Sequence, residues 1–548
     1  MRTITAAFLL CTTLGSAIAR LPSNLPRATL TQGTFVGNFT KPSAVFFGNI
    51  PYAEPPLGDL RFRKPVIHHT EAEGSTEEYD ARNFGNFCLQ QPAYTGVGSE
   101  DCLTLNIWKP ANATETDRLP VLVYIHGGGL NYDSPIQNKM GDIVEETGII
   151  GVNMAYRLNF AGFATSKDLV EDGIRNAGLW DQRAALEWVQ RNIEKFGGDP
   201  TRVTIAGESA GAAAVLYQMF GNGGDPEGLF HGAIMSSIST SFIATVEDAE
   251  EWYKTAGETA GCDNSTTIAQ CLRQSSELAF RAASNAVYYK YQLGPLFDDF
   301  FITDLPSRLI SSGKFAKVPV IAGHTTYDAF LHLASVKPIG AEAFGGNTTE
   351  DFWEGIARRT TNFTDATKAQ VEEMYPLSEE FSSQWERAGT ALTDMWFGCL
   401  DWLVVNASIK AGVNDSYLFR WDAADPSRGP WNGLNMAVHA TDLYYMWEGY
   451  NFTGVAAPAW RVLSGTENAL AREVHGYWAG FTRTVGTPNF DSRRVDWQPA
   501  SQTQGGLARL VIALGNDSET ASIMENTPAI HEERCTFWSA EVNWDFRF

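Results

Sequence analysis

The chain has 548 residues, of which 44% are hydrophobic and only 19% are charged, so it can build a large core and is not a disordered chain. Acidic residues outnumber basic ones by 64 to 41, which gives a formal net charge of -23. This charge argues against nucleic acid or an anionic membrane surface as a partner, because the phosphate groups would repel the protein.

The first nineteen residues resemble an export signal. Arg2 provides a positive start, the segment from Ile4 to Leu14 is mostly apolar, and Ala17-Ile18-Ala19 has the small-x-small form of a cleavage site. The alternative is a buried N-terminal helix. The longest later stretch without Asp, Glu, Lys or Arg, residues 228–246, contains His231 and several Ser and Thr residues, so we expect no membrane span. We expect a secreted protein with one domain over residues 20–548.

Sequons and cysteines agree with export. Nine Asn-x-Ser/Thr sequons occur, a density that is typical of a glycosylated surface. They lie at Asn38, Asn112, Asn264, Asn347, Asn362, Asn406, Asn414, Asn451 and Asn516.

Six cysteines remain when Cys11 of the leader is set aside, and six allow fifteen disulfide connectivities. Closeness in sequence favours Cys88–Cys102 and Cys262–Cys271, which leaves Cys399–Cys535. The alternative is a metal cluster, but no Cys-x-x-Cys or His-Glu-x-x-His spacing occurs. We therefore expect three disulfides and no metal site.

Short apolar runs that end near Gly, Ser or His are typical of buried parallel strands. Five such runs are Val121–Ile125, Ile149–Ala155, Val203–Ala206, Ala233–Ser237 and Val318–Ala322. Apolar residues at helical spacing predict a helix from Asp181 to the break at Gly197. Alternating strands and helices predict a doubly wound α/β sheet, with the chemistry at the carboxyl ends of its strands.

The first of these strands ends in His126-Gly127-Gly128-Gly129, a loop without side chains that would obstruct its backbone. The loop could be a flexible turn or a phosphate cradle, but the Lys-Ser/Thr pair of a phosphate loop does not follow it. If a serine attacks an ester nearby, the N–H groups of Gly128 and Gly129 could stabilise the oxyanion.

The third strand leads into Gly207-Glu208-Ser209-Ala210-Gly211, followed by an Ala-rich apolar helix from Ala212. A serine on a tight turn between a strand and a helix is a candidate nucleophile, and the helix N-terminus adds free N–H groups. The N–H of Ala210 would be a third oxyanion donor. The alternative is an ordinary glycine-rich turn with a capping serine.

The chain resembles the type-B carboxylesterase/lipase family of α/β-hydrolases. The segments that carry the resemblance are 47–56 with Arg61-Phe62, Ser99–Asn106, Asn176–Gln182, the Gly207–Gly211 motif and Arg534–Trp538. It implies an α/β-hydrolase fold with a large, mostly parallel sheet and helices on both faces. It also implies a serine ester hydrolase that needs no cofactor.

The resemblance selects His439, in Met436–Leu443, as the catalytic histidine among nine. We expect His475 to be structural, since it lies on an amphipathic helix. His324 and His332 flank the presumed acid and are expected to support it or lie at the surface. His126 is expected to shape the oxyanion loop.

The acid implied by the resemblance is Asp328, where the family usually has an acid followed by glycine and often has Glu. Asp is shorter by one methylene, so its loop must approach the imidazole more closely. The alternative is a solvated loop aspartate, but the chain order Ser-Asp-His is that of α/β-hydrolases. Ser237 aligns with a serine that supports this acid, although Ile238 replaces the usual glycine. Glu208 matches a family position that could tune the local field.

Only thirteen residues separate Cys88 from Cys102, where secreted lipases and cholinesterases of the family have a long flap. So short a loop favours an open gorge, and with Tyr94 as its only aromatic residue it disfavours a choline ester. We expect a small-to-medium, neutral ester as the substrate. A true lipase, a secondary-metabolite esterase or acyltransferase, and a catalytically silent binding protein of the same fold are the alternatives. The sequence indicates no oligomeric state.

Overall fold

A computed structural model of the chain describes residues 21–68, 77–91, 98–170, 175–239, 243–262, 267–291, 293–330, 333, 348–357, 363–377, 381, 383–427, 435–451, 459–489, 494–503, 506–516 and 519–540. The predicted export signal lies outside these residues. Within them, no helix combines the length and the apolar character needed to cross a bilayer.

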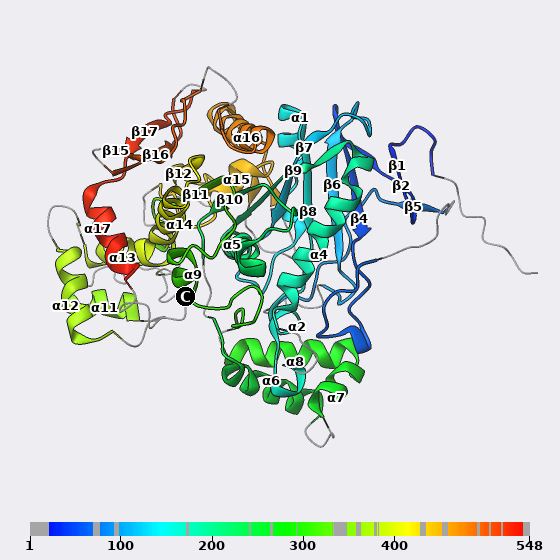
Figure 1. The fold of residues 1–548 in the computed structure, drawn as a ribbon, viewed down its shortest axis with the longest axis horizontal. Coiled ribbons are helices and arrows are strands. Elements are labelled where there is room, and N and C mark those ends of the chain that lie inside the picture. Colours follow the sequence, from blue (N-terminus) through cyan, green and yellow to red (C-terminus); the bar gives the residue numbers. More distant parts are fainter. Residues whose placement is uncertain are drawn as a thin grey trace, which may run out of the picture.

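The described residues form one large mixed sheet of twelve strands (Figure 1). In spatial order its strands are β15 (Gln502–Thr503), β16 (Gly506–Ile512), β12 (Ser416–Trp421), β11 (Val320–Thr325), β10 (Gly232–Ser236), β9 (Gly198–Glu208), β7 (Leu119–Ile125), β8 (Ile150–Met154), β6 (Thr104–Pro110), β4 (Ala44–Pro51) and β3 (Asn38–Lys41), with β17 (Ile523–Asn526) paired to β16. The run from β16 to β8 is parallel throughout, and antiparallel strands flank it on both sides. The predicted α/β-hydrolase architecture is confirmed.

The described residues also form two smaller sheets outside it. They comprise β1 (Arg27–Leu30), β2 (Gly33–Val36) and β5 (Glu78–Asp80), and the pair β13 (Tyr450–Asn451) and β14 (Ala459–Trp460).

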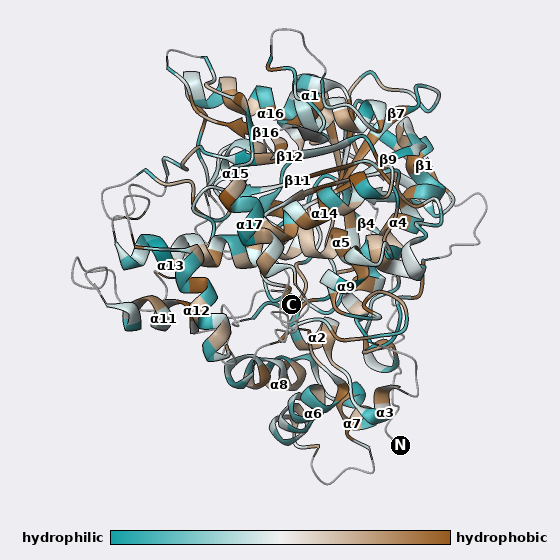
Figure 2. Ribbon diagram, turned by 60° about the vertical axis from the view of Figure 1, so that its left-hand side comes forward, coloured by the Kyte–Doolittle hydropathy of each residue, from teal (hydrophilic) through white to brown (hydrophobic). Residues whose placement is uncertain are grey.

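Helices cover both faces of the large sheet, because its parallel strands are apolar on both sides. One face packs against α4 (Ala177–Asn192), α5 (Ala210–Gly224) and α14 (Cys399–Lys410), and the other against α1 (Gly141–Thr147), α15 (Asp442–Met446) and α16 (Gly465–Thr484). Figure 2 shows hydrophobic colour along the central strands, whereas the outer helices and loops are mainly hydrophilic.

The remaining helices gather around the sheet in two groups (Figure 1). One group holds α2 (Asn159–Phe163), α3 (Lys167–Val170), α6 (Val246–Ala260), α7 (Ile268–Gln274) and α8 (Glu277–Lys290). The other holds α11 (Thr349–Ala357), α12 (Asp365–Met374), α13 (Gln384–Thr393) and α17 (Ala529–Trp538), while α9 (Pro306–Ser311) lies between them.

The predicted strands exist, but their bounds differ. β9 begins five residues before Val203, and β11 lies two to three residues later than predicted. β10 ends at Ser236, and the next residue, Ser237, has a φ of 53°, which lies outside the extended range of a regular strand. The predicted helix is α4, which begins at Ala177 and continues as a 3₁₀ turn to Phe196.

Three disulfides join the predicted cysteine pairs: Cys88–Cys102, Cys262–Cys271 and Cys399–Cys535. The last ties α17 to the start of α14, so it fixes the C-terminal helix to a helix that packs on the central sheet.

The sequons fall in different environments. Asn112, Asn414 and Asn516 are exposed, Asn38 is half-buried in β3, and Asn451 lies in β13. Asn264, Asn347 and Asn362 lie outside the described residues. Asn406 is buried in α14 with only 8% of the residue exposed, which leaves little room for a sugar in the folded protein.

We expect glycans at Asn112, Asn414 and Asn516 of the protein secreted by a eukaryotic host, and an unmodified Asn406. A glycan at Asn406 would prevent α14 from packing on the sheet. Glycopeptide mass spectrometry measures each occupancy, and a substantial fraction of glycosylated Asn406 in folded protein would contradict the placement of this helix.

Candidate active site

Ser209 lies on the tight turn between β9 and α5, as its motif predicts. Its backbone has φ 58° and ψ −127°, a conformation that is costly for a residue with a side chain. A Cβ on Gly207 would overlap the backbone of Gly211, and one on Gly211 would overlap the carbonyl of Ile125. Only glycines allow this close approach, which directs the Ser209 side chain away from the sheet.

Backbone contacts bring two distant loops together beside this serine. The Tyr327 N–H donates to the Ala437 carbonyl at 3.0 Å, and Tyr327 pairs with Val438 as an isolated bridge. The next residue of each loop is a functional candidate. Asp328 Oδ1 lies 2.5 Å from His439 Nδ1, and His439 Nε2 lies 2.8 Å from Ser209 Oγ. The three candidates therefore form one continuous hydrogen-bonded chain.

Asp328 is fully buried and held by further donors. Its Oδ2 accepts a hydrogen bond from the Ser237 hydroxyl at 2.6 Å and one from the Thr325 N–H at 2.9 Å. Burial favours the neutral acid, but His439 and Ser237 outweigh it and lower the pKa of Asp328 below its usual value. Ser237 thus supports the acid even though Ile238 follows it.

The glycine loop lies against the nucleophile. A Cβ at Gly127 would lie 3.2 Å from Ser209 Cβ, so the loop touches the serine side chain directly. The N–H groups of Gly128, Gly129 and Ala210 donate to no other described residue. They are free to bind a charged oxygen.

Glu208 is a buried carboxylic acid beside the histidine. Its Oε1 lies 3.4 Å from His439 Nε2, and burial raises the pKa of Glu208 to about 8. Burial opposes a charge on His439 as well, but the carboxylates of Glu208 and Asp328 outweigh it and raise the pKa of His439 to about 9. The ionised form of Glu208 thus favours protonated His439.

The other described histidines lie away from the reacting atoms. The His126 ring stacks on Tyr156 at 4.5 Å, and burial lowers its pKa to about 4, so it stays neutral within the oxyanion loop. His475 binds Glu146 at 2.7 Å in the core, as a structural residue does. His324 is buried next to Asp401 at 3.3 Å, not at the surface. His332 lies outside the described residues.

Two site residues were missed in the sequence. The ring of Phe397, in a π-helical turn over Asp394–Gly398, packs on the His439 ring with 4.9 Å between centroids. Asp442 begins α15 three residues after His439, and burial raises its pKa to about 6. The spacing from the histidine could have indicated Asp442, whereas no sequence signal indicates Phe397.

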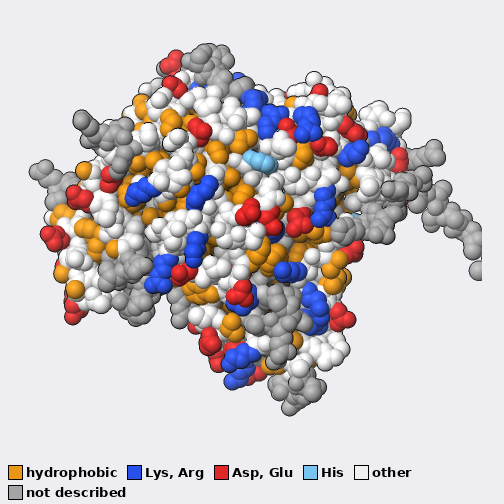
Figure 3. Space-filling model, viewed as in Figure 1, with side chains coloured by type: hydrophobic (Ala, Val, Ile, Leu, Met, Phe, Trp, Pro, Cys, Tyr) orange, Lys and Arg blue, Asp and Glu red, His pale blue; other side chains and the backbone are white. Residues whose placement is uncertain are grey.

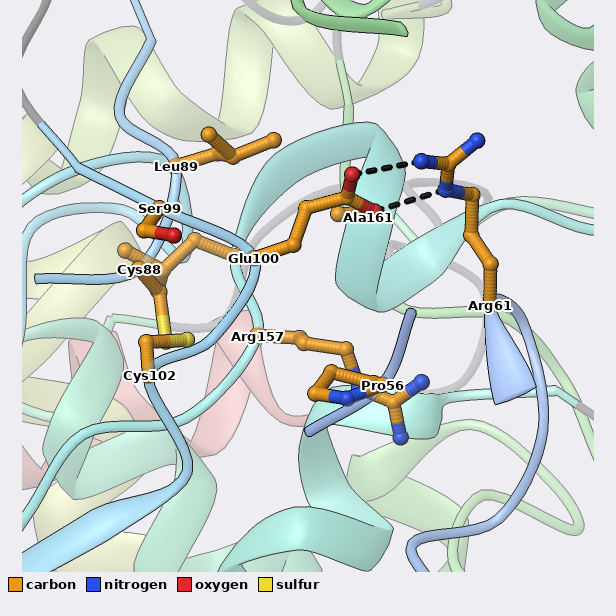
Figure 4. A pocket seen from close by; sticks show the side chains of 10 residues that line it. Pro56, Arg61, Cys88, Leu89, Ser99, Glu100, Cys102, Arg157 and Ala161 are labelled. Carbon is orange, nitrogen blue, oxygen red and sulfur yellow. Dashed lines mark hydrogen bonds and ion pairs between the residues drawn. A yellow bond between two sulfur atoms is a disulfide. The ribbon is translucent and has the colours of Figure 1, made fainter. Parts of the chain in front are cut away.

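The loop between Cys88 and Cys102 is anchored at its base (Figure 4). Glu100 forms a bidentate ion pair with Arg61, at 2.6 and 2.5 Å, next to the disulfide. The carbonyl of Gly98 accepts a hydrogen bond from Arg281 of α8 at 2.7 Å. Residues 92–97, which include Tyr94, lie outside the described residues.

The described residues contain no group of three or more His, Cys, Asp or Glu side chains that could hold a metal ion. Figure 3 shows acidic and basic side chains mixed over the face drawn.

Comparison with known proteins agrees with this geometry. The model of the carboxylesterase family matches residues 25–538. The chain belongs to this family of serine ester hydrolases. A secreted triacylglycerol lipase of Gibberella zeae is 32% identical over 460 residues, which cover 74% of this chain and 76% of that lipase. The bile salt-activated lipase of Bos taurus is 30% identical over 513 residues, covering 86% and 81%.

Among solved structures, Aspergillus niger EstA superposes with a TM-score of 0.80 and 26% identity, covering 96% of this chain and 99% of that chain. This carboxylesterase family member therefore keeps the α/β-hydrolase fold over nearly its whole length.

We expect Glu208→Gln to move the acid limb of the kcat/KM profile to lower pH. The substitution removes a negative charge that stabilises protonated His439, so the neutral imidazole persists at lower pH. Initial rates on a soluble ester across the pH range measure the shift. Glu146→Gln, which alters the partner of the structural His475, is the matched control and should leave the limb in place. An acid limb that stays at the same pH, or moves to higher pH, in Glu208→Gln would contradict this electrostatic account.

Proposed function

We propose that the protein is a secreted serine carboxylesterase of one domain, which hydrolyses small-to-medium neutral carboxylic esters through an acyl-Ser209 intermediate. The single observation that carries the proposal is the unbroken chain from Asp328 through His439 to the Ser209 hydroxyl, at 2.5 and 2.8 Å. The chain lies at the carboxyl ends of β9 and β11, where α/β sheets place their chemistry.

In the first half of the reaction, Ser209 Oγ attacks the acyl carbon of the ester while His439 Nε2 takes its proton. Asp328 keeps the proton on Nδ1 and stabilises the imidazolium that forms. The free N–H groups of Gly128, Gly129 and Ala210 bind the oxyanion, and the loss of one such donor typically costs about 3–4 kcal/mol of transition-state stabilisation.

In the second half, His439 returns its proton to the alkoxide oxygen, and the alcohol leaves. A water molecule then donates its proton to His439 as it attacks the acyl carbon, and the acid is released with Ser209 regenerated. This sequence needs no cofactor. Phe397 packs on the imidazole and would hold its plane through both halves.

The anchored loop between Cys88 and Cys102 supports a substrate that enters from solution. The disulfide, Glu100 and Gly98 hold its base, and at thirteen residues it is short for a lid that swings over an acyl chain. An open gorge fits a soluble ester better than a lipid droplet.

A true lipase is the second candidate, because the relatives named above are lipases. Secretion is supported by the three disulfides and by a relative that is named a secreted lipase. Acyl transfer to another alcohol would use the same three residues. A silent binding protein is disfavoured because serine, histidine and acid are present and hydrogen-bonded.

We expect the secreted protein to hydrolyse p-nitrophenyl esters with a maximum at short acyl chains, from acetate to hexanoate, and Ser209→Ala to be inactive because it lacks the nucleophile. The measurement is p-nitrophenolate release along the series from acetate to palmitate, with Ser239→Ala as a control for substitution near the turn.

A maximum at long chains that appears only above the micelle threshold would make the protein a lipase. Full activity of Ser209→Ala would contradict the proposed mechanism altogether.

A further inference from the structure

Far from the catalytic serine, a groove with a volume of about 680 Å³ lies at the β3 edge of the large sheet. Five strand spacings separate β3 from β9, roughly 24 Å. None of the residues that line it takes part in the proposed reaction, so an occupant of the groove would be separate from the ester substrate.

The register of the sheet places an asparagine beside an aromatic surface. Asn38 lies opposite Phe46 on β4, and Phe46 lies opposite Trp108 on β6. Side chains that lie opposite in antiparallel strands share one face. The rings of Phe46 and Trp108 are 4.8 Å apart, and Phe84 packs 4.8 Å from Phe46. Phe84 is only half-buried, so the groove offers aromatic carbon next to Asn38.

The charges that line the groove are matched. Lys41 lies 2.6 Å from Asp142 and 3.7 Å from Glu448, and Lys139 lies 3.5 Å above the Trp460 ring. Arg82 pairs with Asp80 at 2.6 Å. Aromatic faces together with balanced polar groups suit a neutral, polyhydroxylated ligand better than an anion, because sugars present C–H faces to rings and hydroxyl groups to charged side chains.

Asn38 is itself the first residue of a sequon, Asn38-Phe39-Thr40. Its side chain lines the groove and makes no hydrogen bond to another described residue. β3 is also an edge strand of the sheet, and Phe39 on it is 52% exposed. Native proteins cover such edges because unpaired strands invite pairing with other chains.

We propose that Asn38 carries an N-linked oligosaccharide whose first sugars lie in this groove, stacked on Phe84 and covering the β3 edge. The proposal presupposes the secretory route but does not depend on the ester chemistry. The attached glycan is the favoured occupant because its point of attachment lies in the wall of the groove.

The test is enzymatic deglycosylation of the native protein, secreted by a eukaryotic host and followed over time by glycopeptide mass spectrometry. Peptide N-glycosidase should release the Asn38 glycan roughly tenfold more slowly than the glycan on exposed Asn112, since a docked glycan is accessible only about a tenth of the time. After denaturation the two rates should be equal. Equal rates in native protein would overturn the proposal, as would an Asn38 without glycan; occupancy at Asn112 then shows whether the secretory route or the site failed.

Substitutions in the groove distinguish a docked glycan from one that the glycosidase reaches slowly only because Asn38 lies in a strand. Phe84→Ala should speed the release from Asn38 and leave Asn112 unchanged, with the circular dichroism spectrum as the check of folding. Phe87 also lines the groove, and Phe87→Ala replaces the first variant if that variant does not fold. Unchanged slow release in the folded variant would overturn the proposal.

Thr40→Ala, which removes the sequon, leaves the groove open for titration with chitobiose. Chitobiose binding there together with fast release in the native protein would assign the groove to a free sugar instead.

Discussion

The backbone turn at Ser209 is the constraint on which the site depends. A serine at φ 58° and ψ −127° costs roughly 1–3 kcal/mol, and the surrounding structure must hold it there. β9 holds it from one side through parallel pairing with β7 and β10, and α5 holds it from the other. The two glycines permit the contact between them. As a result, the Ser209 hydroxyl points out of the sheet and the first N–H groups of α5 remain free.

The partners of this serine, Asp328 and His439, lie 119 and 230 residues further along the chain. Neighbouring strands of the parallel run place them beside it. Ser237 follows β10 and Asp328 follows β11, so the parallel register places them side by side. The histidine loop, after β12, is fixed by the backbone bonds of Tyr327 to Ala437 and Val438. Sheet order thus converts residues that are distant in sequence into neighbours at one edge.

Local patterns in the sequence predict the parts of this arrangement that depend on local sterics. The Gly207–Gly211 motif predicts the nucleophile turn, and apolar runs predict the parallel strands. Spacing alone could not select His439 or Asp328, because their positions depend on loops whose paths the sheet determines; a family resemblance was needed. Phe397 reaches His439 through a π-helical turn that no local pattern indicates. The burial of Asn406 has a related cause, since a sequon does not reveal which helix face is buried.

The central claim is that Ser209 is a nucleophile activated by His439, and covalent labelling tests it most directly. Diethyl p-nitrophenyl phosphate reacts with such a serine, releases p-nitrophenolate and leaves a diethylphosphoryl group. The account predicts one group per folded chain, on the peptide that contains Ser209, and no labelling of His439→Ala on the same timescale. Labelling of another residue, or a folded protein that takes up no label, would contradict it.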